Sequence, residues 1–164
     1  MHGGSSLFVK AGRYVTDDDY RSFRDFAPEL LKYAMDLSLH TGCGLAAILS
    51  LTWKDVHTVG VRRDRWEIVI AGVSGAKRKI AITQQIESAL RKCRVMEPNW
   101  PHQYVIRFEA DGKRLSVKEF NVIWGLYMKR WAALPTNQFS FHDIRAKALT
   151  DRQLSRRVSR RPGH

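Results

Sequence analysis

The sequence has no apolar run of the length that a membrane span needs, which is about 20 residues. It contains only two cysteines, Cys43 and Cys93, so it has neither a disulfide framework nor the spacing of a metal site. We therefore expect a reducing, cytoplasmic setting and neither a metal nor a cofactor. Residues 1–13 lack the basic start and apolar block of a signal peptide, and their glycines and serines predict a flexible arm.

Acidic residues are scarce relative to basic ones. The 164-residue chain has 28 Lys and Arg against 16 Asp and Glu, which gives a formal net charge of +12. From Arg145 onward there are seven basic residues and one acid, so much of the surplus lies at the C-terminal end. A surplus of this size favours a polyanionic partner, most often nucleic acid.

Helix start and stop signals divide most of the chain into helices. Thr16 precedes three aspartates, which is the pattern of an N-cap with acids in the first turn. A second helix follows Pro28 and ends where Gly42 can supply a left-handed turn. Ser116 and Glu119 have the spacing of a capping box, and the helix after them carries an aromatic stripe. Further helices are expected over 44–56, over 84–96 and from Phe141 onward.

The middle of the chain has a strand pattern instead. Residues 66–70 alternate in the manner of a strand, and residues 74–83 return through a Ser-Gly turn with Ile80 and Ile82 on one face. These two segments predict an antiparallel hairpin, and residues 104–108 could add a third strand. We therefore expect an α+β fold, mainly helical with a small antiparallel sheet. It forms one domain over 14–154, and the basic stretch 155–164 is expected to be a disordered tail.

Two segments contain residues that could carry chemistry. The first is HTGCGLAAILSLTWKDV, residues 40–56, and the second is FSFHDIRAKALTD, residues 139–151. In the second, His142 and Arg145 are three residues apart, which puts both on one face of a helix. Both could then reach one phosphate, the arginine through its planar fork of donors. Taken alone, the pair is more simply explained as a solvated arginine and a polar residue at a helix start, because a surface charge is the common case.

Together, in this order and around a basic hairpin, the two segments resemble the catalytic domain of tyrosine recombinases, the phage integrase family, over residues 14–151. The second segment looks most like prophage integrases. The resemblance implies site-specific DNA recombination and integration through a 3′-phosphotyrosyl intermediate. In that family two arginines hold the scissile phosphate and a hairpin lysine protonates the leaving oxygen. The expected partner is double-stranded DNA in the bacterial cytoplasm, with weak self-association and with neither a membrane nor a small-molecule ligand.

The match to the family's site residues is partial. His142 and Arg145 fit the family's H-x-x-R. The first clamp arginine of the family corresponds to Gly44 here, and the acid three residues further on corresponds to Ala47. The hairpin lysine corresponds to Val73. Glycine has no side-chain charge or donor, so half of the expected phosphate clamp is absent from this sequence.

Other residues are weaker candidates for the same site. Lys77, just after the hairpin turn, could replace the missing lysine, although a lysine that contacts DNA or solvent explains it more simply. His164, in Pro-Gly-His, resembles the histidine of the family's Leu-Gly-His. DNA contacts are expected from the basic residues Lys77, Arg78, Lys79, Lys147 and Arg152.

No tyrosine of this sequence stands where the resemblance places the nucleophile. The family's tyrosine follows the histidine motif, whereas all five tyrosines here precede His142. We therefore expect a truncated or decayed integrase catalytic domain that binds DNA and does not cut strands as it stands. The alternative is a non-catalytic basic DNA-binding module. An RNA-binding or ribosome-associated protein would explain the charge alone.

Overall fold

The computed structural model describes residues 13–59, 65–71, 76–95, 103–108 and 111–159. In chain order its elements are α1 (Asp17–Phe26), α2 (Glu29–Thr41), α3 (Leu45–Ser50), η1 (Trp53–Asp55), β1 (Val56–Val59), β2 (Arg65–Ala71), β3 (Lys77–Ala81), α4 (Gln84–Val95), α5 (Val117–Trp131), η2 (Pro135–Asn137) and α6 (Phe141–Ser159). Within these ranges no helix combines the length and the apolar character that crossing a bilayer requires.

The helix ends follow their local capping signals. The Thr16 side chain accepts a hydrogen bond from the Asp19 backbone N–H at 3.1 Å, which starts α1 as predicted. At the start of α5, Ser116 and Glu119 form the predicted capping box. Gly42 ends α2 with φ of 73°, a left-handed conformation that glycine adopts without steric cost.

The small sheet has the order β1-β2-β3, and both pairs are antiparallel. The predicted hairpin is confirmed, with Ile68 opposite Ile80. The prediction of a strand at 104–108 is wrong, because that stretch makes only isolated bridges. The third strand is β1, at the end of the segment predicted as one helix. A capping box between Thr52 and Asp55 interrupts that segment, and the chain continues as a strand paired with β2.

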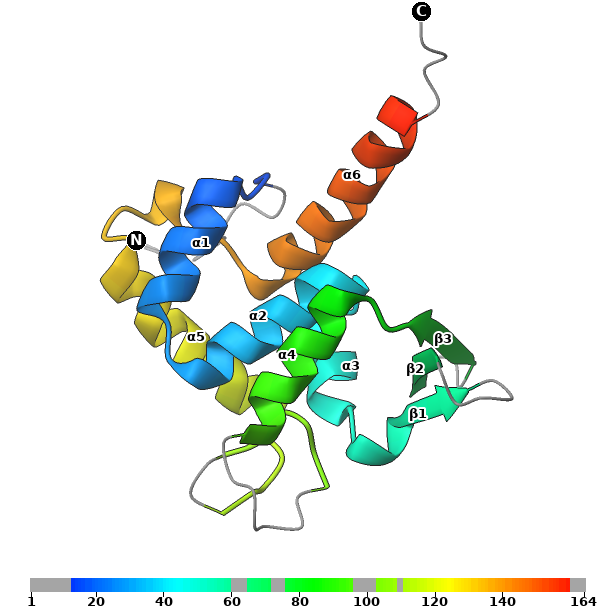
Figure 1. Cartoon of the computed structure of the whole chain (residues 1–164). Coiled ribbons are helices and arrows are strands. Elements are labelled where there is room, and N and C mark those ends of the chain that lie inside the picture. The colour runs from blue at the N-terminus through cyan, green and yellow to red at the C-terminus, as the bar shows by residue number, and fades with distance from the viewer. Residues whose placement is uncertain (1–12, 60–64, 72–75, 96–102, 109–110, 160–164) are drawn as a thin grey trace, which may run out of the picture.

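The core lies around α2, which crosses the centre of the molecule (Figure 1). It packs against α4 on one side and α6 on another, and buries its apolar side chains Leu31, Ala34, Met35 and Leu37. A second part of the core is a cluster of edge-to-face aromatic rings from α1, α5 and the start of α6, formed by Phe23, Phe120, Trp124, Phe139 and Phe141. The packing of α6 on α2 and the ring contacts of Phe141 together hold the N-terminal half of α6 against the body.

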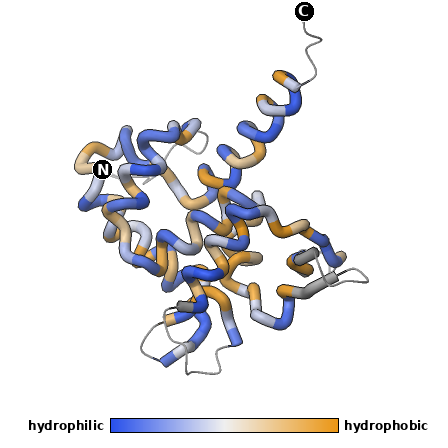
Figure 2. Tube along the Cα trace, in the orientation of Figure 1, coloured by the Kyte–Doolittle hydropathy of each residue, from blue (hydrophilic) through white to orange (hydrophobic). Residues whose placement is uncertain are grey.

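The C-terminal half of α6 projects from the body (Figure 1). The helix continues through Ser159, so residues 155–159 are helical rather than part of a disordered tail. Their side chains are exposed, in agreement with the absence of an apolar stripe. Figure 2 shows polar and apolar residues alternating along this projecting part. Residues 160–164 lie outside the described ranges.

Candidate phosphate-binding site at the end of α2

A buried hydrogen-bond network fixes the turn after α2. The Thr41 hydroxyl donates to the Leu37 carbonyl at 2.6 Å and accepts from the Cys43 backbone N–H at 3.1 Å. The Ser38 hydroxyl donates to the Cys43 carbonyl at 2.8 Å. Ser38 and Thr41 are fully buried, and these bonds give their hydroxyls the partners that buried polar groups require. The turn therefore places Gly44 at a defined position just before α3.

The start of α6 brings the second sequence segment to this turn. Ser140 and buried Asp143 cap the helix reciprocally, with the Ser140 backbone N–H donating to Asp143 Oδ2 at 2.7 Å. His142 is exposed, and Arg145, one turn further along, is half-buried. Arg145 Nε donates to the Gly42 carbonyl at 3.2 Å, which fixes the guanidinium at the end of α2.

Gly44 lies next to this guanidinium. A Cβ added at Gly44 would lie 3.8 Å from Arg145 Nη1, an ordinary van der Waals contact. Its φ of −76° is open to any L-residue, so the backbone does not require glycine there. The two positions that the resemblance assigns to the phosphate-clamping arginines are thus neighbours in space. In this chain one of them has no side chain.

Gly42 differs, because it is required by both its conformation and its surroundings. Its φ is positive, and an added Cβ would approach Arg152 Nη1 to 3.0 Å. Arg152 lies there because its Nη2 donates to the His40 carbonyl at 2.6 Å. Arg145 and Arg152 are two helical turns apart on one face of α6, and both bind carbonyls at the C-terminal end of α2. That end of a helix carries partial negative charge, which favours the two cations.

The expectation that Lys147 contacts DNA is not supported by its position. Its side chain is only 2% exposed, and its ammonium lies 2.6 Å from Asp17 Oδ1 and 2.9 Å from Asp151 Oδ2. It also donates to the Tyr14 hydroxyl at 3.3 Å. Burial lowers the pKa of Lys147, but the hydrogen bonds to these three residues outweigh it and raise the pKa above its usual value. Lys147 therefore anchors α6 to the start of α1.

The basic residues of β3 are placed as the DNA-binding prediction needs, on the surface. Lys77, Arg78 and Lys79 are all exposed, and Lys79 makes a 3.5 Å ion pair with Glu67. Among the described residues neither a hydrogen bond nor an ion pair joins Lys77 to Arg145 or His142, so its role in the site stays a prediction. Val73 and His164 lie outside the described residues.

Three tyrosines, Tyr14, Tyr20 and Tyr127, make hydrogen bonds or ring contacts that stabilise the fold. Tyr20 is buried and donates to Asp36 Oδ1 at 2.9 Å, and burial, followed by the Asp36 charge, raises the pKa of its hydroxyl above the usual value. Tyr127 lies on α5 and packs against Phe26 with ring centroids 6.1 Å apart. Tyr14 donates to Asp151 Oδ1 at 2.9 Å.

Sequence reasoning missed Ser38 and Thr41 as positioning residues. The only available signal was a pair of small hydroxyl residues three apart before a glycine, inside an apolar helix. It also missed that Arg145 is held by a backbone carbonyl, because the partner at Gly42 is distant in sequence. The structure supplies both facts, and with them the geometry of the site.

Several solved structures are similar to this one. The lambda integrase catalytic core has 18% sequence identity and a TM-score of 0.61, and the match covers 88% of this chain and 90% of that chain. The XerH site-specific recombinase bound to difH substrate has 15% identity and a TM-score of 0.61, covering 89% and 44%. The Tn1549 transposon integrase in complex with circular intermediate DNA has 18% identity and a TM-score of 0.62, covering 92% and 54%.

The match to a lambda integrase dimer bound to a COC′ core site covers 42% of that chain, so this chain spans less than half of its length. No protein-family model and no curated protein matches the sequence. The property shared with the solved structures is therefore the three-dimensional arrangement of the chain. The chain has the fold of the tyrosine recombinase catalytic domain.

Proposed function

We propose that this chain is the catalytic-type domain of a site-specific recombinase of the phage integrase kind and that it binds double-stranded DNA. The observation that carries the proposal is the placement of Arg145, fixed against the end of α2 beside Gly44. Support comes from the fold, because the similar structures include lambda integrase bound to DNA and XerH bound to difH substrate.

In the proposed complex a backbone phosphate lies against Arg145 and the exposed His142. Arg145 uses one N–H for the Gly42 carbonyl, so its remaining donors can bind two phosphate oxygens. A carbonyl is a dipole and does not neutralise the guanidinium, and no carboxylate among the described residues pairs with it. The basic strand β3, with Lys77, provides further contacts to the DNA backbone.

We further propose that this chain does not cleave DNA. The support is Gly44, which leaves one side of the scissile phosphate without the arginine that the resemblance implies. Loss of one positioned hydrogen-bond donor that stabilises transition-state charge typically lowers a rate by about 10²–10³. Incubation with a nicked suicide substrate should yield no covalent protein–DNA adduct on a denaturing gel. An adduct would show that cleavage does not need an arginine at position 44.

The salt dependence of binding tests the DNA partner directly. The affinity for a labelled duplex should fall steeply between about 50 and 200 mM salt, because Lys and Arg that contact phosphates release counterions from DNA. Fluorescence anisotropy measures it, with a duplex RNA of the same sequence as competitor. An affinity that barely changes with salt contradicts the proposal, and preferential binding of the RNA would favour the RNA-binding alternative.

The substitution Gly44→Arg tests the incomplete clamp. The backbone conformation accepts a side chain, and the new guanidinium would lie beside that of Arg145. We expect duplex affinity to rise about tenfold, the effect of one charge-assisted contact. Gly44→Gln is the matched control of similar length without charge, and it should leave the affinity unchanged. If both variants behave alike, the phosphate does not lie at Gly44.

Self-association is a further part of the proposal. The similar structures include dimers and a tetramer of lambda integrase on DNA. For this chain we expect a monomer or a weak dimer in the absence of DNA. Sedimentation velocity with and without a duplex measures this, and a stable tetramer without DNA would contradict it.

A further inference from the structure

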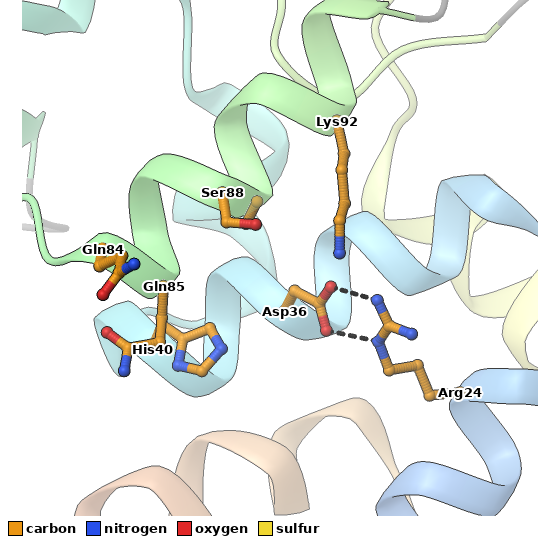
Figure 3. Close-up of a pocket in the computed structure, with 8 residues that line it drawn as sticks. Arg24, Asp36, His40, Gln84, Gln85, Ser88 and Lys92 are labelled. Carbon is orange, nitrogen blue, oxygen red and sulfur yellow. Dashed lines mark hydrogen bonds and ion pairs between the residues drawn. The ribbon is translucent and has the colours of Figure 1, made fainter.

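A pocket of about 390 Å³ lies over α2, with α4 and α1 forming its walls (Figure 3). This volume is within the range of ligand pockets, about 300–1,000 Å³. Its lining is polar except for one alanine, and consists of Arg24, Asp36, His40, Gln84, Gln85, Ser88, Ala89 and Lys92.

The single carboxylate of the pocket is already neutralised. Arg24 binds Asp36 in a bidentate manner, with Nε 2.7 Å from Oδ1 and Nη2 2.6 Å from Oδ2. The Tyr20 hydroxyl donates to the same carboxylate at 2.9 Å. The Asp36 charge is therefore compensated by a partner of opposite sign, and it offers little repulsion to an anion in the pocket.

The α4 wall supplies a cation and uncharged donors. Gln85, Ser88 and Lys92 are spaced by three and four residues, so they share one face of α4. Figure 3 shows the Lys92 side chain extending from α4 toward the Asp36–Arg24 pair. Lys92 is exposed and has no ion-pair partner within the described part of the chain. Because Arg24 and Asp36 cancel, the formal charge of the pocket is that of Lys92, with His40 neutral.

The pocket adjoins the candidate phosphate site through α2. His40 contributes its imidazole to the pocket, while its carbonyl accepts from Arg152. Two residues later the Gly42 carbonyl accepts from Arg145. The cations Arg152 and Arg145 therefore flank the C-terminal end of α2, and Lys92 faces Asp36, about one turn before that end (Figure 3). A polyanion bound at Arg145 has this pocket beside it.

We propose that the pocket holds a second backbone phosphate of the bound DNA, with the Lys92 ammonium as its cation and Ser88 and Gln85 as hydrogen-bond donors. This inference rests on the proposed DNA binding and adds a contact outside the Arg145 site. A free phosphate ion shares the same chemistry, so the experiments below separate the two sources. The predicted contact is to the backbone, so it is independent of base sequence.

The first test compares two lysines by the salt dependence of duplex binding. Lys92→Gln should make the negative slope of log K against log salt less steep by about 0.9, the value for one phosphate contact. Lys129→Gln is the matched control, because this lysine is also exposed and lies on α5, outside the pocket. We expect it to leave the slope unchanged. If the two variants have equal slopes while binding still depends on Arg145, the second phosphate contact is wrong but the proposed DNA binding stands.

Failure of the proposed function has a different signature. In that case the unsubstituted chain binds the duplex without salt dependence, or not at all, and Arg145→Gln changes nothing. Lys92 and Lys129 are both exposed, and both substitutions remove one positive charge. Circular dichroism and thermal unfolding should therefore show that both variants remain folded.

His40 provides a second, local measurement. Burial lowers the pKa of its imidazole; Asp36 of α2 opposes this, while Arg152 of α6, Arg24 of α1 and Lys92 of α4 lower it further. A phosphate in the pocket adds negative charge beside the ring and should raise that pKa. Histidine NMR titration, with the His40 signal assigned through His40→Gln, measures the pKa with and without ligand.

The titration is carried out with each of the two phosphate sources, the DNA duplex and inorganic phosphate. We expect the duplex to raise the His40 pKa in the unsubstituted chain and to raise it less in Lys92→Gln. Inorganic phosphate at millimolar concentration should produce a smaller change in the same direction. An unchanged His40 pKa in the presence of saturating duplex overturns the inference. A response to inorganic phosphate alone also overturns it, because the pocket would then be a site for small anions.

Discussion

The cations on the two faces of α6 have different partners, carboxylates on one face and backbone carbonyls on the other. On one face Lys147 is buried between the carboxylates of Asp17 and Asp151. On the other, Arg145 and Arg152 are held by the carbonyls of Gly42 and His40. Lys147 and Arg145 are two residues apart, which rotates them by about 200° around the helix axis. Neighbouring positions in the sequence therefore have opposite surroundings.

The difference separates cations that stabilise the fold from cations that can bind a ligand. Carboxylates neutralise Lys147 and leave it no charge to offer a phosphate. Carbonyls fix the two arginines in place without neutralising them, and no carboxylate of the described residues pairs with either. The charge count of the sequence includes both kinds, so it overstates the number of cations available to DNA.

The largest expected effect is on stability and comes from Lys147→Met. The substitution keeps the length of the side chain but removes its hydrogen bonds to Asp17, Asp151 and Tyr14. We expect the free energy of unfolding to fall by about 2 kcal/mol, the scale for losing hydrogen bonds of a charged group. Urea denaturation measures it. The exposed Lys118→Met should change little, and equal effects of the two substitutions would mean that Lys147 is not an anchor.

The next effect is on DNA affinity and comes from Arg145→Gln. This variant keeps a donor for the Gly42 carbonyl but loses the charge and the planar fork. We expect duplex affinity to fall about tenfold, the equivalent of about 1.4 kcal/mol, with little change in stability. Anisotropy on Arg145→Gln and Lys147→Met, both verified as folded, measures the contrast. A larger loss in the lysine variant would reverse the assignment of the two faces.

A third, smaller effect separates the two glycines that these arginines contact. Gly42→Ala forces a side chain into the left-handed region and toward Arg152, so we expect a loss of about 1 kcal/mol. Gly44→Ala keeps an allowed φ and meets Arg145 at an ordinary distance, so its stability should be unchanged or slightly higher. Thermal unfolding of both variants measures this. Equal losses would mean that the Gly44 position is closed to a side chain.

The smallest effect is the pH dependence of the Lys147 cluster. A hydrogen bond from Lys147 and its charge lower the pKa of Asp17 in the folded protein. The stabilisation is therefore complete above the ordinary Asp pKa of about 3.9 and is lost as the pH falls through the lower folded value. The stability difference between the unsubstituted chain and Lys147→Met should shrink below about pH 4. Urea titrations at pH 7 and pH 3 test this, and a constant difference would exclude Asp17 as a contributor.

The sequence predicted features that depend on local chemistry. Thr16, Gly42 and Ser116 mark helix ends through bonds to residues a few positions away, so their patterns are visible in the chain. The β1 strand was missed because these residues become a strand only through pairing with β2, and the residues before them favour a helix. Periodicity cannot detect a partner on another strand.

For the candidate site, the sequence predicted the pairing of Gly44 with Arg145 only through the resemblance. Their contact joins segments about 100 positions apart, and no local rule relates them. Lys147 was misjudged for the same reason, because its partner Asp17 lies near the other end of the chain. The pocket beside His40 combines three helices and could not be predicted from any one of them.

The hydrogen bond between Arg145 and the Gly42 carbonyl has a consequence for the energetics of binding. An arginine loses about 2 kcal/mol of rotamer entropy when it is immobilised. Here part of that loss occurs when the chain folds, because the turn after α2 already restrains the guanidinium. In the proposed DNA complex the phosphate would thus meet an arginine that is already restrained, and preorganisation of this kind favours affinity without adding any contact.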